Sequence, residues 1–187
     1  MTCDGDVASP AIDAAEHRTR ARDEAFERLF AAEYRRVVAI AARVLGRMES
    51  AEDVAQDVFV AFARRYAADA PFAAPWLHTA AAHTALNVIR GEKRRRSREA
   101  REAILRDALD GAGAVAADPL RCALASEHRD EVRRALARLP RHHATLLALR
   151  YGGLAYREIA AAIGVKPASV GTMLARAEAA FAKAFDA

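Results

Sequence analysis

The feature that most constrains the fold is a pattern of small and apolar residues around Gly164. Gly164 follows Ala160 by four positions, and glycine readily adopts the positive φ that a sharp turn between two helices needs. Apolar residues occupy the positions that face inward when two helices cross steeply: Ile159, Ile163, Val165, Val170 and Leu174. Pro167 suits a first helical turn, where its missing N–H is not needed. The pattern predicts a helix-turn-helix; a plain helical hairpin in a bundle is the alternative.

The second helix of such a motif enters the major groove of DNA. On its outward face, Lys166 and Arg176 are expected to contact phosphates, which position a protein on the duplex. Ser169 and Thr172 are short enough to reach base edges. Met173 lies beside the packing seam, and we expect it to belong to the core.

The rest of the 187-residue chain also has a helical pattern. Gly (9) and Pro (6) are scarce, and no alternating β-branched run predicts a strand. Gly46 is a predicted C-cap and Ser50 a predicted N-cap. Apolar residues at spacings of three and four predict helices over 23–45, 51–66, 75–96, 126–139, 140–151, 155–163 and 167–185. The expected fold class is all-α.

Two stretches interrupt this pattern. Residues 1–20 are polar and lack periodicity, so we expect a disordered tail. Residues 99–125 contain Asp-Gly-Ala-Gly and Asp-Pro breaks, so we expect a flexible linker. The sequence therefore predicts two small helical domains, over 21–98 and 126–187.

Charge is separated along the chain more than its net value of +4 suggests. Between Arg90 and Arg101 there are seven Lys or Arg against two Glu, whereas Glu49 to Asp57 is acidic. A cationic cluster binds phosphates by releasing their counterions. We expect one partner surface for nucleic acid and a different, acidic one for another partner.

Nothing in the sequence indicates catalysis. His142 and His143 are adjacent, so on a helix they point about 100° apart, and His78 and His83 are five positions apart. No HExxH, GxSxG, P-loop or GxGxxG motif is present. We expect no catalytic residue, no metal and no cofactor.

The expected compartment is the cytoplasm. Cys3 and Cys122 belong to no CxxC motif, so we expect neither a disulfide framework nor a zinc site. The first residues are acidic where a signal peptide would be basic, and no apolar run approaches the ~20 residues of a membrane span. No membrane insertion is expected.

Three segments, taken in order, resemble bacterial RNA polymerase sigma factors of the extracytoplasmic-function (ECF) type. The first is AEDVAQDVF at 51–59, and the second is PWLHTA at 75–80 with the basic run that follows. The third combines Leu-Pro at 139–140, Leu-Arg-Tyr at 149–151 and Glu-Ile-Ala at 158–160. The resemblance covers about residues 24–184 and implies two helical domains, called region 2 and region 4.

The resemblance implies that the acidic helix of region 2 binds the polymerase core. In the family this helix docks on the clamp of the β′ subunit, and the β subunit is a further partner. The residues that match are Glu52, Asp53, Gln56 and Asp57. Acids near a helix N-terminus also complement the helix dipole, by ~0.3–1 kcal/mol, so a structural role is the alternative. Anti-sigma proteins commonly hold members of this family.

The loop at 67–74 and the helix after it resemble the part that captures the unwound minus-ten strand. Positions 83, 87, 90 and 94 share one helix face, and a polar stripe that ends in cations suits single-stranded DNA. We favour a role as core anchor over base stacking for Trp76. The candidate residues of region 2 are Trp76, His83, Asn87, Arg90, Lys93, Arg94 and Arg95.

Region 4 is expected to bind the duplex minus-thirty-five element. Its candidate residues are Arg157, Lys166, Ser169, Thr172 and Arg176. The family usually has Ser at position 155, and Ala155 lacks its capping hydroxyl, a loss worth ~1 kcal/mol.

The leading hypothesis is a sigma factor that binds RNA polymerase core and directs promoter recognition and transcription initiation. The alternative is a stand-alone helix-turn-helix regulator with an N-terminal interaction module, which would usually dimerise on a two-fold site. A helical adaptor that binds only proteins is a third hypothesis, against which the basic run argues.

Overall fold

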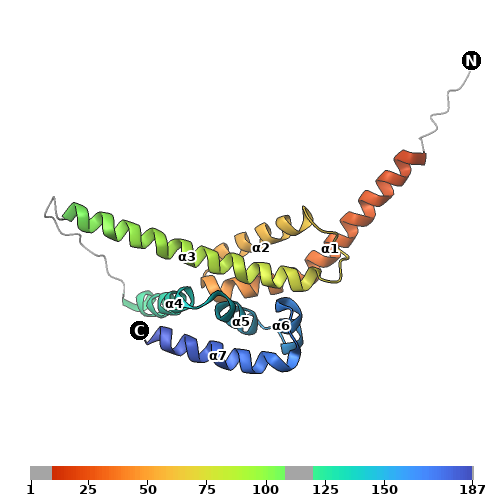
Figure 1. The fold of residues 1–187 in the computed structure, drawn as a ribbon. Coiled ribbons are helices and arrows are strands. Elements are labelled where there is room, and N and C mark those ends of the chain that lie inside the picture. The colour runs from red at the N-terminus through yellow and green to blue at the C-terminus, as the bar shows by residue number, and fades with distance from the viewer. Residues whose placement is uncertain (1–9, 108–119, 187) are drawn as a thin grey trace, which may run out of the picture.

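The computed structural model describes residues 10–107 and 120–186, which form seven α-helices and no strand (Figure 1). The expected all-α fold class is confirmed. In chain order the helices are α1 (Pro10–Leu45), α2 (Met48–Ala63), α3 (Ala73–Asp107), α4 (Leu120–Arg138), α5 (Arg141–Tyr151), α6 (Tyr156–Ile163) and α7 (Pro167–Phe185).

Helices α1, α2 and α3 pack against one another as an N-terminal module. Its core consists of the predicted apolar stripes, and its largest fully buried side chains are Val37, Ile40, Val44, Leu45, Phe62, Leu77 and Leu86. Gly46 has φ +69° and donates its N–H to Ala42 O at 2.8 Å. This confirms Gly46 as the cap that ends α1.

Two helix starts differ from the prediction. Helix α1 begins at Pro10, so the disordered tail expected over 1–20 is wrong for residues 10–20; residues 1–9 lie outside the described residues. Proline is tolerated in a first turn, and no Gly or Pro interrupts the chain between there and Leu45. Helix α2 begins at Met48, which places Ser50 inside its first turn rather than at the N-cap.

The predicted linker is shorter than expected. Helix α3 continues to Asp107 and α4 begins at Leu120, so the residues at 99–107 and 120–125 are helical. No Gly or Pro occurs in this extension of α3, and Arg95 pairs with Glu99 one turn later at 3.6 Å. Only 108–119 of the expected flexible linker lies outside the described residues.

Helices α4 to α7 form the C-terminal module. Helix α7 packs against α4, α5 and α6, and the core contains Leu136, Leu139, Leu146, Leu147, Leu149, Leu154, Ile159, Val170 and Leu174. Gly152 and Gly153 end α5 as predicted, and the bounds of α6 and α7 agree with the sequence pattern.

The two modules pack directly on one another. Helix α3 contacts α4, α5 and α6, and α1 contacts α5. The buried apolar residues of both modules form one continuous cluster. Helices α4, α5 and α6 lie along α3, and α7 lies on the far side of them (Figure 1). The sequence did not predict this contact. None of the described helices has an apolar stretch that could cross a membrane.

Candidate nucleic-acid interface

Helices α6 and α7 form the predicted helix-turn-helix. Of the positions expected to face inward on the crossing helices, Ile159, Val170 and Leu174 are buried, and Ile163 and Val165 are half-buried and pack against the core. Gly164 has φ +72°, and the next N–H, of Val165, donates to Ala160 O at 3.0 Å. The turn therefore uses the left-handed conformation that the sequence pattern requires.

The start of α6 is capped by one carboxylate. The Ala155 N–H donates to Glu158 Oε2 at 2.7 Å, and Arg36 of α1 donates to Glu158 Oε1 at 2.5 Å. Because Ala155 has no side-chain acceptor, only this half of a capping box forms. The Ala155 hydrogen bond and the nearby Arg36 charge hold the pKa of Glu158 below its usual value, and burial opposes them. Glu158 thus links the helix-turn-helix to the N-terminal module.

The outer face of the helix-turn-helix is open to solvent. Every predicted region 4 contact is exposed: Arg157, Lys166, Ser169, Thr172 and Arg176. Met173 is half-buried and packs against the core, as expected. This face could meet a DNA duplex without rearrangement of α7.

The polar face of α2 is also open. Glu52, Asp53, Gln56 and Asp57 are all exposed, whereas the opposite face of the helix is buried in the N-terminal core. Within the described residues, none of these four side chains makes a hydrogen bond or an ion pair.

The predicted strand-binding stripe on α3 is only partly open. Asn87, Lys93, Arg94 and Arg95 are exposed, but His83 and Arg90 are half-buried. Arg90 Nη2 donates to Leu139 O at 3.0 Å, at the end of α4. Burial, followed by the charges of Arg141 and Arg90, lowers the pKa of His83 below 6.5.

Trp76 lies in an aromatic cluster at the start of α3. Its ring is 5.5 Å from that of Phe62 and 5.6 Å from that of Tyr66, measured between centroids. Phe72, in the preceding loop, packs edge-on to Tyr66 at 5.2 Å and is 45% exposed. This half-buried position of Trp76 is compatible with the anchoring role we favoured.

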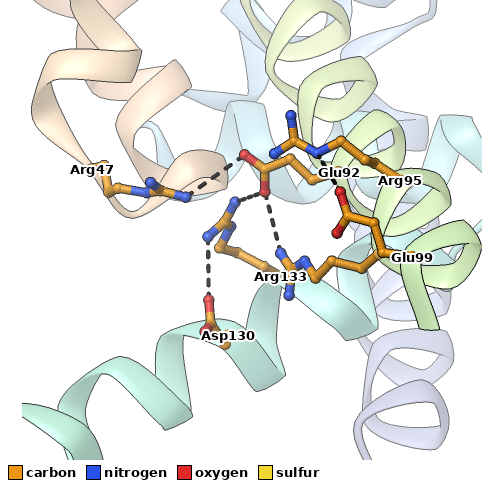
Figure 2. Close-up of polar contacts among 7 residues, drawn as sticks. Arg47, Glu92, Arg95, Glu99, Asp130 and Arg133 are labelled. Carbon is orange, nitrogen blue, oxygen red and sulfur yellow. Dashed lines mark hydrogen bonds and ion pairs between the residues drawn. The ribbon is translucent and has the colours of Figure 1, made fainter. Parts of the chain in front are cut away.

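An ion cluster that the sequence did not reveal joins the modules where α3 meets α4 (Figure 2). We call it the Glu92 cluster; it consists of Arg47, Glu92, Arg96, Asp130 and Arg133. Glu92 accepts from Arg133 and lies 3.6 Å from Arg47 and 3.3 Å from Arg96. Arg133, whose side chain is 9% exposed, also donates to Asp130 at 3.2 Å. The one signal in the sequence was an acid inside the basic run.

Among the described residues, the histidines belong to no group of three or more His, Cys, Asp or Glu that could hold a metal ion. His78 is buried, and its Nε2 lies 2.8 Å from Glu33 Oε2, so it is a satisfied core residue. The rings of His142 and His143 are 4.1 Å apart, and burial and the His142 charge lower the pKa of His143.

Two family comparisons match these modules. Residues 29–95 match sigma-70 region 2, and residues 129–181 match sigma-70 region 4. No match was found among curated proteins. The chain belongs to the sigma-70 family, and region 2 with region 4 but no region 3 is the typical ECF architecture.

The family assignment decides between the hypotheses raised by the sequence. Sigma factors are not enzymes; they bind RNA polymerase core and direct promoter recognition at transcription initiation. The region 2 match favours this function over a stand-alone regulator or an adaptor, because neither would need a sigma-70 region 2 as its N-terminal module.

Proposed function

We propose that this sigma factor uses three separate surfaces, each for a different partner. The α2 face of Glu52, Asp53, Gln56 and Asp57 docks on the clamp of the polymerase β′ subunit. The α3 stripe holds the unwound minus-ten strand, and α7 enters the major groove of the minus-thirty-five element.

The α2 face supports the docking assignment because its polar groups have no partner in the part of the chain that the structure describes. All four side chains are exposed and none is paired with another described residue. Dipole complementation explains an acid in the first turn, where Glu49 lies, but not acids that continue to Asp57. This unpaired acidic face is the observation that carries the proposal.

The α3 assignment rests on the chemistry of the stripe. Asn87 offers a donor and acceptors for base edges, and Lys93, Arg94 and Arg95 offer exposed cations for phosphates. Such a polar and cationic groove suits single-stranded DNA.

The α7 assignment rests on exposure and residue type. Ser169 and Thr172 are exposed near the N-terminal end of α7, the end that contacts bases in a helix-turn-helix. Lys166, Arg176 and Arg157 of α6 flank them as phosphate contacts.

We also propose the broader setting of the protein. Further partners are the polymerase β subunit and an anti-sigma protein, and the compartment is the cytoplasm, where sigma factors act. As domain limits we propose 21–98 for region 2 and 126–187 for region 4, which contain the matched spans 29–95 and 129–181.

Reversal of two charges on α2 tests the docking surface. Asp53→Lys with Asp57→Lys should weaken binding to purified core by at least about tenfold, because the charge of the proposed docking face is then reversed. Binding is measured by pull-down and titration, and run-off transcription at a mapped start site should fall in parallel.

The matched control is Glu24→Lys with Glu27→Lys, which reverses two exposed acids on α1. It should bind core like the unmodified chain. Equal binding by both double variants would remove the docking role from α2 while leaving the family assignment intact.

A further inference from the structure

A cationic cavity of about 310 Å³ lies between α3 and α4, where the two modules meet. Each module contributes one of its walls. The charged side chains of its lining are Lys93 and Arg96 from α3, Arg133, Arg134 and Arg138 from α4, and the acids Glu92 and Asp130. Five cations against two carboxylates give this lining a clear excess of positive charge.

Both carboxylates of the cavity are already paired. Glu92 forms ion pairs with three arginines, one of which is Arg133, and Arg133 also donates to Asp130 at 3.2 Å (Figure 2). The side chain of Arg133 is only 9% exposed, so these pairs are held in place by the surrounding protein. The excess positive charge of the cavity therefore lies on its other cations.

Three cations of the lining have no carboxylate partner among the described residues: Lys93, Arg134 and Arg138. Arg138 Nη1 donates to Ala184 O at 3.1 Å, but a neutral carbonyl does not compensate the charge. Arg134 and Arg138 are one turn apart on α4, and like charges at this spacing repel each other. An anion between α3 and α4 would relieve this repulsion.

A buried donor of the same cavity also lacks an acceptor. Arg133 Nε is buried and has no hydrogen-bond partner in the described part of the chain. Buried donors in folded proteins nearly always have an acceptor, so a group of this kind needs an explanation. An anion in the cavity that Arg133 lines would supply acceptor oxygens that the chain itself does not.

The residue types and the size of the cavity favour a small phosphorylated molecule. Guanidinium groups match the oxygens of a phosphate in pairs, and a lysine adds a point charge. The volume is at the lower end of the range for small-molecule sites, which suits a compact anion better than a polymer. Ile89 and Ala137 add an apolar part to the lining, against which an uncharged part of the ligand could pack.

We propose that the cavity between α3 and α4 binds a small anion with at least two linked phosphate groups, either free or as part of a nucleotide. Because both modules supply cations, the bound anion stabilises the packing of one module on the other. A small molecule thereby gains influence over the arrangement of the two modules. Of these cations only Lys93 also belongs to the stripe on α3, so the proposal goes beyond the surfaces assigned above to core and promoter.

Calorimetric titration of the full chain with inorganic pyrophosphate tests the site. Pyrophosphate should bind in a ratio of one to one and at least about tenfold more tightly than orthophosphate, because its second phosphate engages cations of the opposite wall. Adenosine and guanosine 5′-diphosphate form the second arm. A nucleoside diphosphate that binds more tightly than pyrophosphate identifies a nucleotide as the ligand, and weaker binding identifies a free polyphosphate.

Two variants remove the cations that have no carboxylate partner. Arg134→Ala with Arg138→Ala should weaken pyrophosphate binding at least about tenfold, since two charge-assisted hydrogen-bond donors are lost. Because Arg138 also contacts the end of α7, Arg134→Glu is tested by itself; position 134 is exposed, so the fold should not change. Circular dichroism checks the helicity of both variants.

The matched control is Arg28→Ala with Arg35→Ala, which removes two exposed cations of α1 that lie outside the cavity. It should bind pyrophosphate like the unmodified chain. Pyrophosphate at about 100 times its dissociation constant should also raise the melting temperature of the unmodified chain and of the control by about 5–10 °C. At equal ionic strength, this rise should be absent in Arg134→Glu.

Three results would overturn the proposal. The first is no binding of pyrophosphate or of either nucleotide below about 1 mM. The second is equal binding by all variants, which would show non-specific attraction to a basic chain. The third is a single-stranded DNA of about 16 nucleotides that needs Arg134 for binding while no small phosphate binds, which would make the cavity part of the nucleic-acid surface. None of these results would affect the proposed docking of α2 on core.

Discussion

The outer face of α2 and the stripe on α3 belong to the same three-helix module, yet the C-terminal module covers only one of them. The α2 acids are exposed and have no hydrogen bond or ion pair with another described residue. On α3, Thr79 and Arg90 donate to main-chain carbonyls of the other module. The surface we assign to core docking is thus available, whereas the stripe that we assign to the unwound DNA strand is partly covered.

This difference gives an order of events. Docking on core needs no rearrangement, because α2 lies away from α4, α5 and α6 (Figure 1). Strand capture needs the modules to separate. A sigma factor built in this way would hold DNA poorly by itself and well only on the polymerase.

The largest difference between the roles of the two faces should appear when charge is reversed on α3. Lys93→Glu with Arg94→Glu should lower open-complex formation by core at least about tenfold, because each lost phosphate contact weakens DNA binding. Core binding should not change, unlike the result expected for Asp53→Lys. The control reverses Arg28 and Arg35, two exposed cations of α1. Loss of core binding in the α3 variant would show that α3 also contributes to core binding, and that the two faces do not have separate roles.

A somewhat smaller effect should appear in the reactivity of single cysteines, introduced after Cys3→Ser and Cys122→Ser. In the free chain, His83→Cys, which lies in the cavity that α5, α6 and α7 cover, should react with a maleimide about tenfold more slowly than Gln56→Cys, in proportion to the open fraction, in which the modules are separated. Addition of core should reverse the order, since it exposes position 83 and covers position 56. A His83→Cys rate that does not respond to core would show that the modules never separate.

The hydrogen bond from Thr79 to Ala162 O should contribute a factor of about five to the equilibrium constant between packed and separated modules. Thr79→Val keeps the shape but removes the donor, and such a bond is worth about 1 kcal/mol. The open fraction, read from the radius of gyration, should rise accordingly. Thr79→Ser retains the hydroxyl and should behave like the unmodified chain. The same radius for both variants would mean that this bond does not hold the modules.

The smallest effect concerns Glu158 and pH. The pKa of Glu158 is lowered in the folded chain. Its carboxylate therefore stabilises the fold at pH values above its ordinary pKa of about 4.5, and this stabilisation is lost as the pH falls through the lowered pKa. Glu158→Gln should therefore lower the melting temperature by about 1–2 °C at pH 7, a modest shift because the group is half-exposed. The two melting temperatures should converge near pH 3. A constant difference across this range would assign the effect to packing instead.

The apolar spacing predicted the helices well because each one buries a continuous stripe. The helix-turn-helix was the clearest case, since Gly164 and its apolar neighbours leave few alternatives. Helix ends were less predictable. Ser50 is a good capping residue, but α2 starts earlier, at Met48 after the Gly46 turn, and has no side-chain cap.

The contact between the modules could not be predicted from side-chain patterns. Two of its acceptors are the main-chain carbonyls of Leu139 and Ala162, and a Cβ at Gly152 would lie too close to Ile40. Its main ion cluster among the described residues joins Glu92 and Arg133, which are 41 positions apart in a chain rich in Arg. Glu92 therefore looked like a neutralising charge in a basic run.

The distance between the modules, with and without core, tests the central claim most directly. Spin labels at exposed positions on each module, through Arg35→Cys and Ala179→Cys in the cysteine-free chain, report it by electron–electron resonance. We predict one narrow distance for the free chain, and a distance in the complex that is longer by at least about 10 Å, within the ~40 Å that the connecting segment allows. A free chain that already shows the long distance, or a complex that keeps the short one, would contradict the account.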